Sequence, residues 1–120
     1  MNIDHNMPKD ELVVQVSREF GLKNLELTYC KTEPLGPKQA RISLSHSALN
    51  YRDLMMIEGL YNPRQPLPLI PCSDGVGRVI ESGSESTWQI GQRVMPIFSQ
   101  GWQDGTPDQE ITKTTLGGPL

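Results

Sequence analysis

The sequence predicts a mostly β fold with one or two short helices. Several short segments alternate apolar and polar residues, one segment has helical spacing, and ten prolines and eleven glycines are spread over 120 residues. With 36% apolar and 21% charged residues, this length suits one domain with its own core and is too short for two. We therefore expect a small barrel or sandwich.

Five segments are expected to be β-strands. In the first three, apolar residues alternate with polar ones, as in a strand with one buried face. The last two have the same extended character and are joined by a link rich in turn-forming residues. The first predicted strand begins at residue 12 and its pattern ends near Phe20 and Gly21, and the other four cover residues 25–30, 40–49, 75–81 and 93–98. No period of either kind is visible after these segments, so no further element is predicted.

Helical spacing appears between the third and fourth predicted strands. Tyr51 and Leu54 lie three residues apart, with Asn50 before them and Gly59 after them. Asn50 is a suitable N-cap and Gly59 a suitable C-terminal stop, so we expect a short helix between them. The following segment, 62–71, contains four prolines and is expected to be an ordered loop.

Charge and hydrophobicity exclude two classes of partner. Eleven basic and fourteen acidic residues give a net charge of −3 without a basic stripe, so nucleic acid is not expected. No apolar run approaches the roughly 20 residues that span a bilayer, so no membrane is expected either. The first ten residues lack the apolar stretch of a secretory signal, and we expect a cytoplasmic location.

Cysteine and histidine residues do not form a recognisable metal motif. Cys30 and Cys72 are too few for a disulfide framework or a four-cysteine zinc site, and each is expected to be buried or half-buried. His46 alternates with Leu44 and Ala48 on the apolar face of the third predicted strand. A hydrogen-bonded interior histidine is therefore expected there, rather than a metal ligand.

A polar cluster follows the third predicted strand, where the chain enters the helix. Ends of strands and first turns of helices commonly carry ligand-binding groups, and the segment 49–53 (L-N-Y-R-D) supplies an amide, a phenol, a guanidinium and a carboxylate. A structural interpretation is also open. In it Asn50 caps the helix, Asp53 interacts favourably with the helix dipole, and Tyr51 packs.

Two glycines precede the fourth predicted strand. Gly75 and Gly77 resemble the start of a dinucleotide-binding fingerprint, but the residue three positions after Gly77 is Ile80 and no helix is predicted to follow. The pair therefore indicates a β-bulge or a close approach of two backbones.

Four motifs in sequence order resemble the N-terminal, GroES-like domain of the medium-chain dehydrogenase/reductase superfamily. They begin at residues 49, 59, 67 and 91 and are L-N-Y-R-D, G-L-Y-N-P, L-P-L-I-P-C-S-D-G-V-G-R-V-I-E-S-G and G-Q-R-V-M-P. The resemblance runs from about residue 10 to the end. It implies that residues 1–120 form a GroES-like partial β-barrel, truncated at its C-terminal end. The Rossmann domain that binds NAD(P)(H) in this family is then absent from this chain.

The same resemblance bears on zinc. In zinc alcohol dehydrogenases a Cys followed by a His matches Asn50 and Tyr51, and a His matches Ser73. None of the three residues here has metal-binding character, so the chain resembles the zinc-independent branch, which includes quinone oxidoreductases and enoyl reductases. Cys72 stands where the family commonly has Gly.

Roles for individual residues also follow from the resemblance. It implies that Asn50 and Tyr51 are catalytic and that both contact the cofactor, together with Arg52, while Tyr61 lines the substrate cleft. Arg52 could instead face a phosphate or an acidic residue. The residues with an implied structural role are Asp53, Asp74, Gly75 and Gly77.

The implied function is hydride transfer to or from a carbonyl, alkene or quinone, dependent on NAD(P)(H) and independent of zinc. The small-molecule substrate would lie between this domain and the absent Rossmann domain, so the isolated chain is expected to be inactive. The choice of NAD or NADP stays open, and a homodimer of the complete enzyme is compatible with the family. The alternative is a free-standing GroES-like binding module without catalytic activity.

Overall fold

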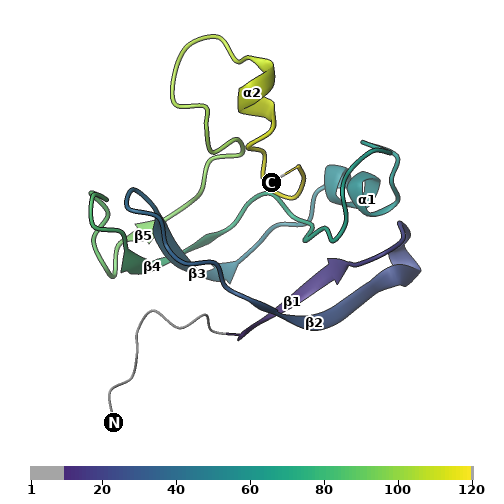
Figure 1. Ribbon diagram of the computed structural model, residues 1–120, viewed down its shortest axis with the longest axis horizontal. Coiled ribbons are helices and arrows are strands. Elements are labelled where there is room, and N and C mark those ends of the chain that lie inside the picture. The colour runs from purple at the N-terminus through teal and green to yellow at the C-terminus, as the bar shows by residue number, and fades with distance from the viewer. Residues whose placement is uncertain (1–9, 120) are drawn as a thin grey trace.

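The computed structural model describes residues 10–119, which form a β-hairpin, a three-stranded sheet and two short helices (Figure 1). Strands β1 (Asp10–Val16) and β2 (Leu25–Lys31) pair antiparallel along their whole length. The 3-10 turn η1 (Leu22–Asn24) precedes β2 directly. The first two predicted strands are thus confirmed, and they form a separate hairpin.

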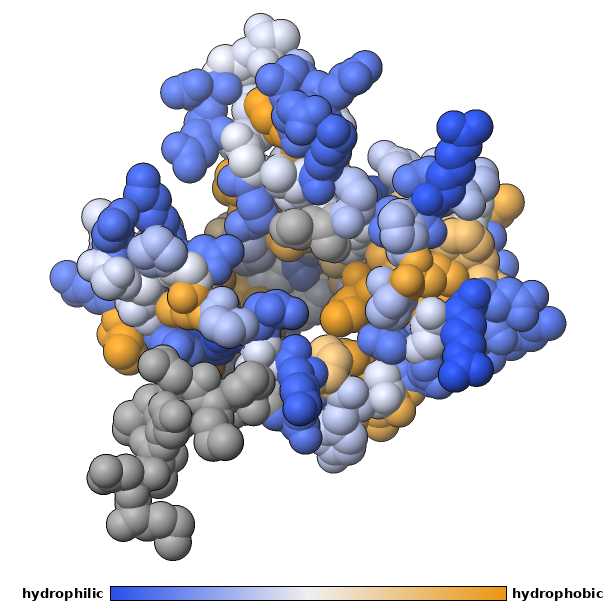
Figure 2. Space-filling view, in the orientation of Figure 1, coloured by the Kyte–Doolittle hydropathy of each residue, from blue (hydrophilic) through white to orange (hydrophobic). Residues whose placement is uncertain are grey.

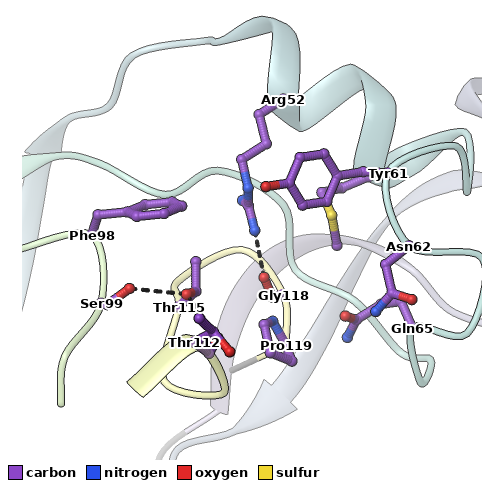
Figure 3. A pocket seen from close by; sticks show the side chains of 11 residues that line it. Arg52, Tyr61, Asn62, Gln65, Phe98, Ser99, Thr112, Thr115, Gly118 and Pro119 are labelled. Atoms are coloured by element: carbon purple, nitrogen blue, oxygen red, sulfur yellow. Dashed lines mark hydrogen bonds between the residues drawn. The ribbon is translucent and has the colours of Figure 1, made fainter. Parts of the chain in front are cut away.

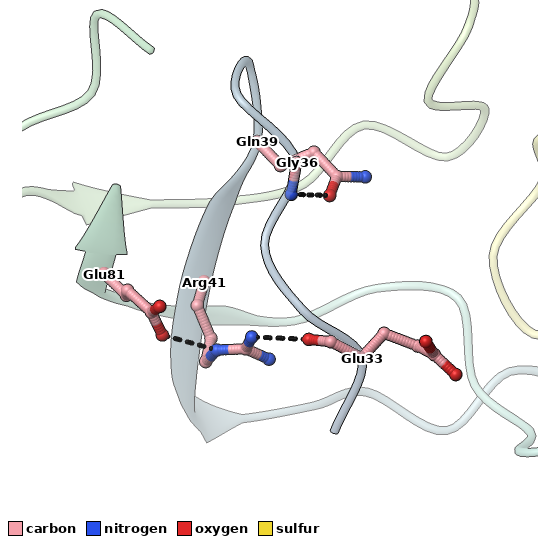
Figure 4. A network of polar contacts seen from close by, with 5 residues as sticks. All are labelled: Glu33, Gly36, Gln39, Arg41 and Glu81. Atoms are coloured by element: carbon pink, nitrogen blue, oxygen red, sulfur yellow. Dashed lines mark hydrogen bonds and ion pairs between the residues drawn. The ribbon is translucent and has the colours of Figure 1, made fainter. Parts of the chain in front are cut away.

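The second sheet has the order β3-β4-β5, and all its pairs are antiparallel. Its members are β3 (Ala40–His46), β4 (Val76–Ser82) and β5 (Arg93–Val94). Figure 4 shows that the Arg41 side chain of β3 forms hydrogen bonds both with β4 and with the segment that precedes β3. Arg41 Nε donates to Glu81 Oε2 on β4 at 2.8 Å, and its Nη2 donates to the carbonyl of Glu33 at 2.7 Å.

Three strand predictions were too long. The first strand ends at Val16 rather than near Phe20. The third strand ends at His46 rather than at residue 49, and β5 covers two residues instead of 93–98. Only Arg93 and Val94 have partners on β4. Pro96 has no N–H to donate, so the chain cannot continue the ladder beyond this point.

The prediction that His46 is an interior residue was wrong. His46 is exposed, and the neighbouring Leu44 on the same face is also more than half exposed. The Nδ1 atom of His46 lies 3.1 Å from Ser45 Oγ. This end of β3 has an apolar face that the described residues do not cover.

The close backbone approach predicted for Gly77 is confirmed. A Cβ on Gly77 would overlap the carbonyl oxygen of Ser43 on β3, so only glycine fits at this position. Gly75 is also close to β3, since its Cβ would lie 3.0 Å from the carbonyl oxygen of His46. The β3–β4 register shifts between Leu44 and His46, beside these glycines.

The predicted helix is present as α1 (Tyr51–Ile57), with Asn50 as its N-cap. Gly59 follows in the left-handed region at φ 70°, as expected for a helix stop. A second helix, α2 (Gln109–Thr112), was not predicted because four residues show no period. Its sequence signal is a cap, since Asp108 Oδ1 accepts from the Ile111 N–H at 2.9 Å.

Five apolar side chains of the described residues are buried, and they come from the hairpin, α1, the loop before β4 and β4 itself. They are Val16, Met56, Ile57, Leu69 and Val79. The proline-rich segment 62–71 is a loop, as predicted, and Leu69 exchanges two backbone hydrogen bonds of 2.9 Å with Val16. No helix within residues 10–119 has the length and apolarity needed to cross a membrane.

The described residues do not close into a barrel. They leave an open groove of about 1950 Å³ along the three-stranded sheet, and its lining includes Ile42, Val79 and, at the end of the hairpin, Leu12. Figure 2 shows the molecule hollowed at its centre, with apolar residues around the hollow. The fold is therefore a partial barrel, and the segment from the end of β3 into α1 lies on one side of it (Figure 1).

Candidate functional site

Asp74 fixes the segment between β3 and α1. Its Oδ1 accepts from the Ala48 N–H at 3.1 Å and its Oδ2 accepts from Asn50 Nδ2 at 2.9 Å. The hydroxyl of Ser47 donates to the Asp74 carbonyl at 2.7 Å. Three hydrogen bonds thus connect this segment to the turn before β4, and the Asn50 amide group has a defined orientation.

Asp53 fixes the same segment from the helix side. Its side chain is 4% exposed, and Oδ2 accepts from the Asn50 N–H at 2.8 Å. The Asp53 N–H in turn donates to the Asn50 carbonyl at 2.9 Å. An acidic residue in the first turn also interacts favourably with the helix dipole. Asn50 is therefore held through both its backbone and its side chain.

Tyr51 is 77% exposed and does not pack, in contrast to the structural interpretation of this residue. Its hydroxyl makes no hydrogen bond within residues 10–119. Leu49, two residues earlier, is also largely exposed. The segment therefore presents a fixed amide and a free phenol on an apolar surface, and both groups can donate hydrogen bonds to an oxygen atom of a ligand.

Cys72 has an unusual backbone conformation. Its φ is 79°, the only positive value at a non-glycine residue between 10 and 119, which accounts for the preference for Gly at the matching family position. Burial raises the pKa of the Cys72 thiol, and the charges of Asp53 and Asp74 raise it further, while a hydrogen bond with Ser47 acts in the opposite direction. The thiol is half-buried, as predicted.

The side chain of Arg52 extends from α1 to the wall of a cavity, near Tyr61 and Phe98 (Figure 3). Its guanidinium carbon is 4.9 Å from the centre of the Tyr61 ring and 5.0 Å from that of Phe98. Nη1 donates to the Leu116 carbonyl at 3.2 Å, and Nη2 donates to the Gly118 carbonyl at 2.5 Å. The guanidinium is therefore occupied by two aromatic faces and two backbone carbonyls.

A cavity of about 360 Å³ adjoins Arg52, between α1 and the C-terminal segment. Tyr61 and Phe98 line it together with residues that include Met56, Gln65 and Thr115. Asn50 and Tyr51 do not line it, so the structure brings Arg52 and Tyr61 together but separates them from the other two site residues. Sequence reasoning missed Phe98 and Gly118; the signal near Gly118 is the run G-G-P at 117–119.

The positions that match zinc ligands lie close together. Asn50 is hydrogen-bonded to Asp74, the residue after Ser73, and Ser73 is 7% exposed. With Tyr51 they supply an amide, a phenol and a buried hydroxyl instead of the thiolate and imidazole ligands that zinc prefers. Within residues 10–119 no group of three or more His, Cys, Asp and Glu side chains could hold a metal ion. These residues do not fit a catalytic zinc.

Comparison with known proteins identifies relatives of this chain. A zinc-type alcohol dehydrogenase-like protein of Schizosaccharomyces pombe is 36% identical over 72% of this chain and 25% of its own length. A mitochondrial enoyl-[acyl-carrier-protein] reductase of Caenorhabditis elegans is 36% identical over 88% and 32%. The solved quinone oxidoreductase from Coxiella burnetii is 29% identical, with a TM-score of 0.67 over 80% of this chain and 31% of that chain.

The chain spans about a quarter to a third of the length of these relatives. The family model of the alcohol dehydrogenase GroES-like domain matches residues 36–118, which include β3, α1, β4 and β5. The polar cluster of Asn50 and Asp74 and the environment of Arg52 lie within this match. This chain therefore belongs to the alcohol dehydrogenase GroES-like domain family of the medium-chain oxidoreductases.

Proposed function

We propose that this chain is the substrate-side domain of a zinc-independent oxidoreductase that transfers a hydride between NAD(P)(H) and a carbonyl, alkene or quinone. The observation that carries the proposal is the pair formed by Asn50 and Tyr51. Asp53 and Asp74 hold Asn50 in place, and Tyr51 is free and exposed beside it. The relatives named as enoyl reductase and quinone oxidoreductase support the substrate classes.

The nicotinamide cofactor would supply the hydride, and the chain's own residues would orient the reactants. The phenol of Tyr51 can donate to an oxygen on which negative charge develops. Asn50 Nδ2 has a second proton beyond the one directed at Asp74, and this proton can bind a ribose hydroxyl or the same oxygen. Neutral donors of this kind fit an uncharged substrate.

Arg52 and Tyr61 lie at the cavity, apart from Asn50 and Tyr51, and their roles need further conditions. A cofactor contact by Arg52 would require its guanidinium to exchange the carbonyls of Leu116 and Gly118 for oxygen atoms of the ligand. Tyr61 forms one wall of the cavity of about 360 Å³, and a role in the substrate cleft would require substrate to enter there. The nucleotide-binding domain lies outside these 120 residues in the proposal.

The test is the steady-state reduction of a quinone and of an α,β-unsaturated ketone by NADPH, using the natural protein that contains this chain. We expect Tyr51→Phe to lower kcat by about 100-fold, the effect of removing one donor from a developing oxyanion. Asn50→Ala should lower it similarly. Tyr29→Phe is the matched control, because Tyr29 is 70% exposed on β2, away from the cluster, and should leave kcat unchanged. An unchanged kcat in Tyr51→Phe would remove Tyr51 from the mechanism.

A further inference from the structure

The guanidinium of Arg52 is the main polar connection between α1 and the C-terminal segment Leu116–Gly118. Its two Nη atoms each donate to a carbonyl of that segment, and its two flat faces lie near Tyr61 and Phe98. Nε is buried and has no partner within residues 10–119. The arrangement requires a planar fork with two separate donor atoms, which a lysine ammonium cannot supply.

Gly117, in the segment bound by Arg52, packs directly against Cys72 in the loop before β4, while Gly118 packs against Met56 of α1 and lines the cavity. Gly117 and Gly118 are both buried, with φ of 72° and 104°. A Cβ on Gly117 would lie 2.5 Å from the carbonyl oxygen of Cys72, and one on Gly118 would lie 2.5 Å from Met56 Cε. Such contacts transmit displacement, because packed atoms cannot move independently.

The loop that Gly117 touches also carries the residue that orients Asn50. Cys72 is two residues before Asp74, whose carboxylate accepts from the Ala48 N–H and from Asn50 Nδ2. A series of links thus runs from Arg52 to Gly118 by a hydrogen bond, along the chain to Gly117, to Cys72 by close packing, and along the chain to Asp74. Asp74 binds Asn50, the N-cap of α1, and Arg52 lies in the first turn of the same helix, so both ends of this series are at the start of α1.

We propose that Arg52 is a positioning residue: by holding Leu116–Gly118 against the Cys72–Asp74 loop, it sets the orientation of the Asn50 amide. The inference rests on the proposed function only in that Asn50 binds the cofactor or the substrate oxygen. It assigns Arg52 a role without a phosphate or a cofactor contact, in agreement with the carbonyls that occupy its donors. The coupling acts between named, contacting groups, so it can be measured without turnover.

The experiment records NMR spectra of the purified 120-residue chain and of Arg52→Lys. We expect the Asn50 side-chain amide and the Ala48 N–H, which both donate to Asp74, to change their chemical shifts. Hydrogen exchange of the Leu116 N–H, which donates to Phe98, should become about tenfold faster, because two hydrogen bonds to a charged group are lost. Addition of inorganic phosphate to the unsubstituted chain should leave the Arg52 Nε–H signal unchanged.

Arg41→Lys is the matched control. Arg41 also makes two hydrogen bonds, to Glu81 and to the Glu33 carbonyl, but lies on β3 away from the segment (Figure 4). Its replacement should change neither the Asn50 nor the Ala48 signals. A signal change at Asn50 in Arg41→Lys equal to that in Arg52→Lys would mean general loosening and would overturn the proposal.

Gly117→Ala approaches the same contacts from the other end and leaves Arg52 intact. It should shift the Asn50 and Ala48 signals as well, since the added Cβ displaces Cys72. The proposal is wrong if both variants alter only residues 116–118 and leave the Asp74 partners as they were. It is also wrong if phosphate shifts the Arg52 Nε–H signal. Neither readout needs a cofactor, so a failure of the proposed function would be a separate result.

Discussion

The position of Cys72 shows how one side chain can conflict with its backbone. A left-handed conformation at a non-glycine residue costs about 1 to 3 kcal/mol. In addition, partial burial and two nearby carboxylates disfavour the ionised form of the Cys72 thiol. Motif comparison identified Cys72 as a departure from Gly, but only the φ value supplies the physical reason. The sequence alone contains no direct signal of a backbone angle at this residue.

The raised pKa of Cys72 predicts slow reaction with an alkylating reagent. The rate of iodoacetamide modification of a Cys30→Ser chain, which keeps only Cys72, should reach half its maximum at a higher pH in the native chain than in denaturing urea. The unfolded thiol then ionises first. Stability should therefore fall as pH rises above the ordinary value near 9.0 and should be unaffected by this group below it.

The control for the stability effect is Cys72→Ser, in which this part of the pH dependence should be absent. Equal half-maximal pH values in the native and the urea-unfolded Cys30→Ser chain would show that the folded environment does not act on the thiol. Chemical denaturation at several pH values above and below 9.0 provides the second measurement.

Among single residues, those with a local signal were predicted correctly. Asn50 as N-cap and Gly59 as helix stop follow from chemistry that acts within one turn. The exposure of Tyr51 and His46 could not be predicted, because it depends on which distant segments cover them. The environment of Arg52 was missed for the same reason, since its partners are more than 60 residues away along the chain.

At the scale of elements, Gly59 ends α1, and two features require glycine there: a positive φ and close packing against Phe20. Gly59 adopts φ 70°, and a Cβ there would lie 2.6 Å from the Phe20 ring. The start of the hairpin connection is joined to the same helix end, because the Gly21 N–H donates to the Ile57 carbonyl at 2.8 Å. The helix stop therefore also determines how α1 sits on the hairpin.

Two alanine substitutions distinguish the cost of the positive φ from the cost of the overlap with Phe20. Gly105 has nearly the same φ, 71°, with no atom within 4 Å of a Cβ, so Gly105→Ala should cost about 1 kcal/mol of unfolding free energy from backbone strain alone. Gly59→Ala should cost about 2 to 4 kcal/mol, because the overlap with Phe20 adds to the same strain. Urea denaturation of both variants measures the difference. Equal losses would show that Phe20 moves aside freely.

The alternation of apolar and polar residues predicted the strands that are seven residues long, but it did not predict the length of the two-residue strand. β1, β2, β3 and β4 each have seven residues, enough for a period to be visible. β5 has two residues, and its length is set by pairing with β4 and by Pro96 rather than by its own pattern. The four-residue α2 depends on the cap at Asp108, and a single cap in a polar stretch is a weak signal.

For the whole molecule, the unclosed barrel leaves apolar surface open to solvent. On one face of the hairpin the exposed apolar residues are Leu12, Val14, Leu27 and Tyr29. The groove of about 1950 Å³ runs along the sheet and reaches this hairpin at Leu12. The relatives are about three times as long as this chain. Motif order predicted the family of the domain, although the separation of the Tyr61 cavity from Asn50 and Tyr51 required the three-dimensional arrangement.

The isolated 120-residue chain should bind NADPH weakly or not at all. The proposed site offers an amide and a phenol to the cofactor, and the donors of Arg52 are occupied by the Leu116 and Gly118 carbonyls, so the phosphates have no prepared partner here. Isothermal titration calorimetry of NADPH into the chain measures this directly. A micromolar Kd would contradict the assignment of cofactor binding to a separate domain.

The central claim is that Asn50 and Tyr51 act at positions where zinc relatives use metal ligands. The measurement that tests it most directly is the zinc content of the purified natural protein, determined together with its NADPH-dependent rate before and after chelation. The account predicts well under one zinc per chain and the same rate after chelator treatment. A stoichiometric zinc whose removal abolishes the rate would contradict it.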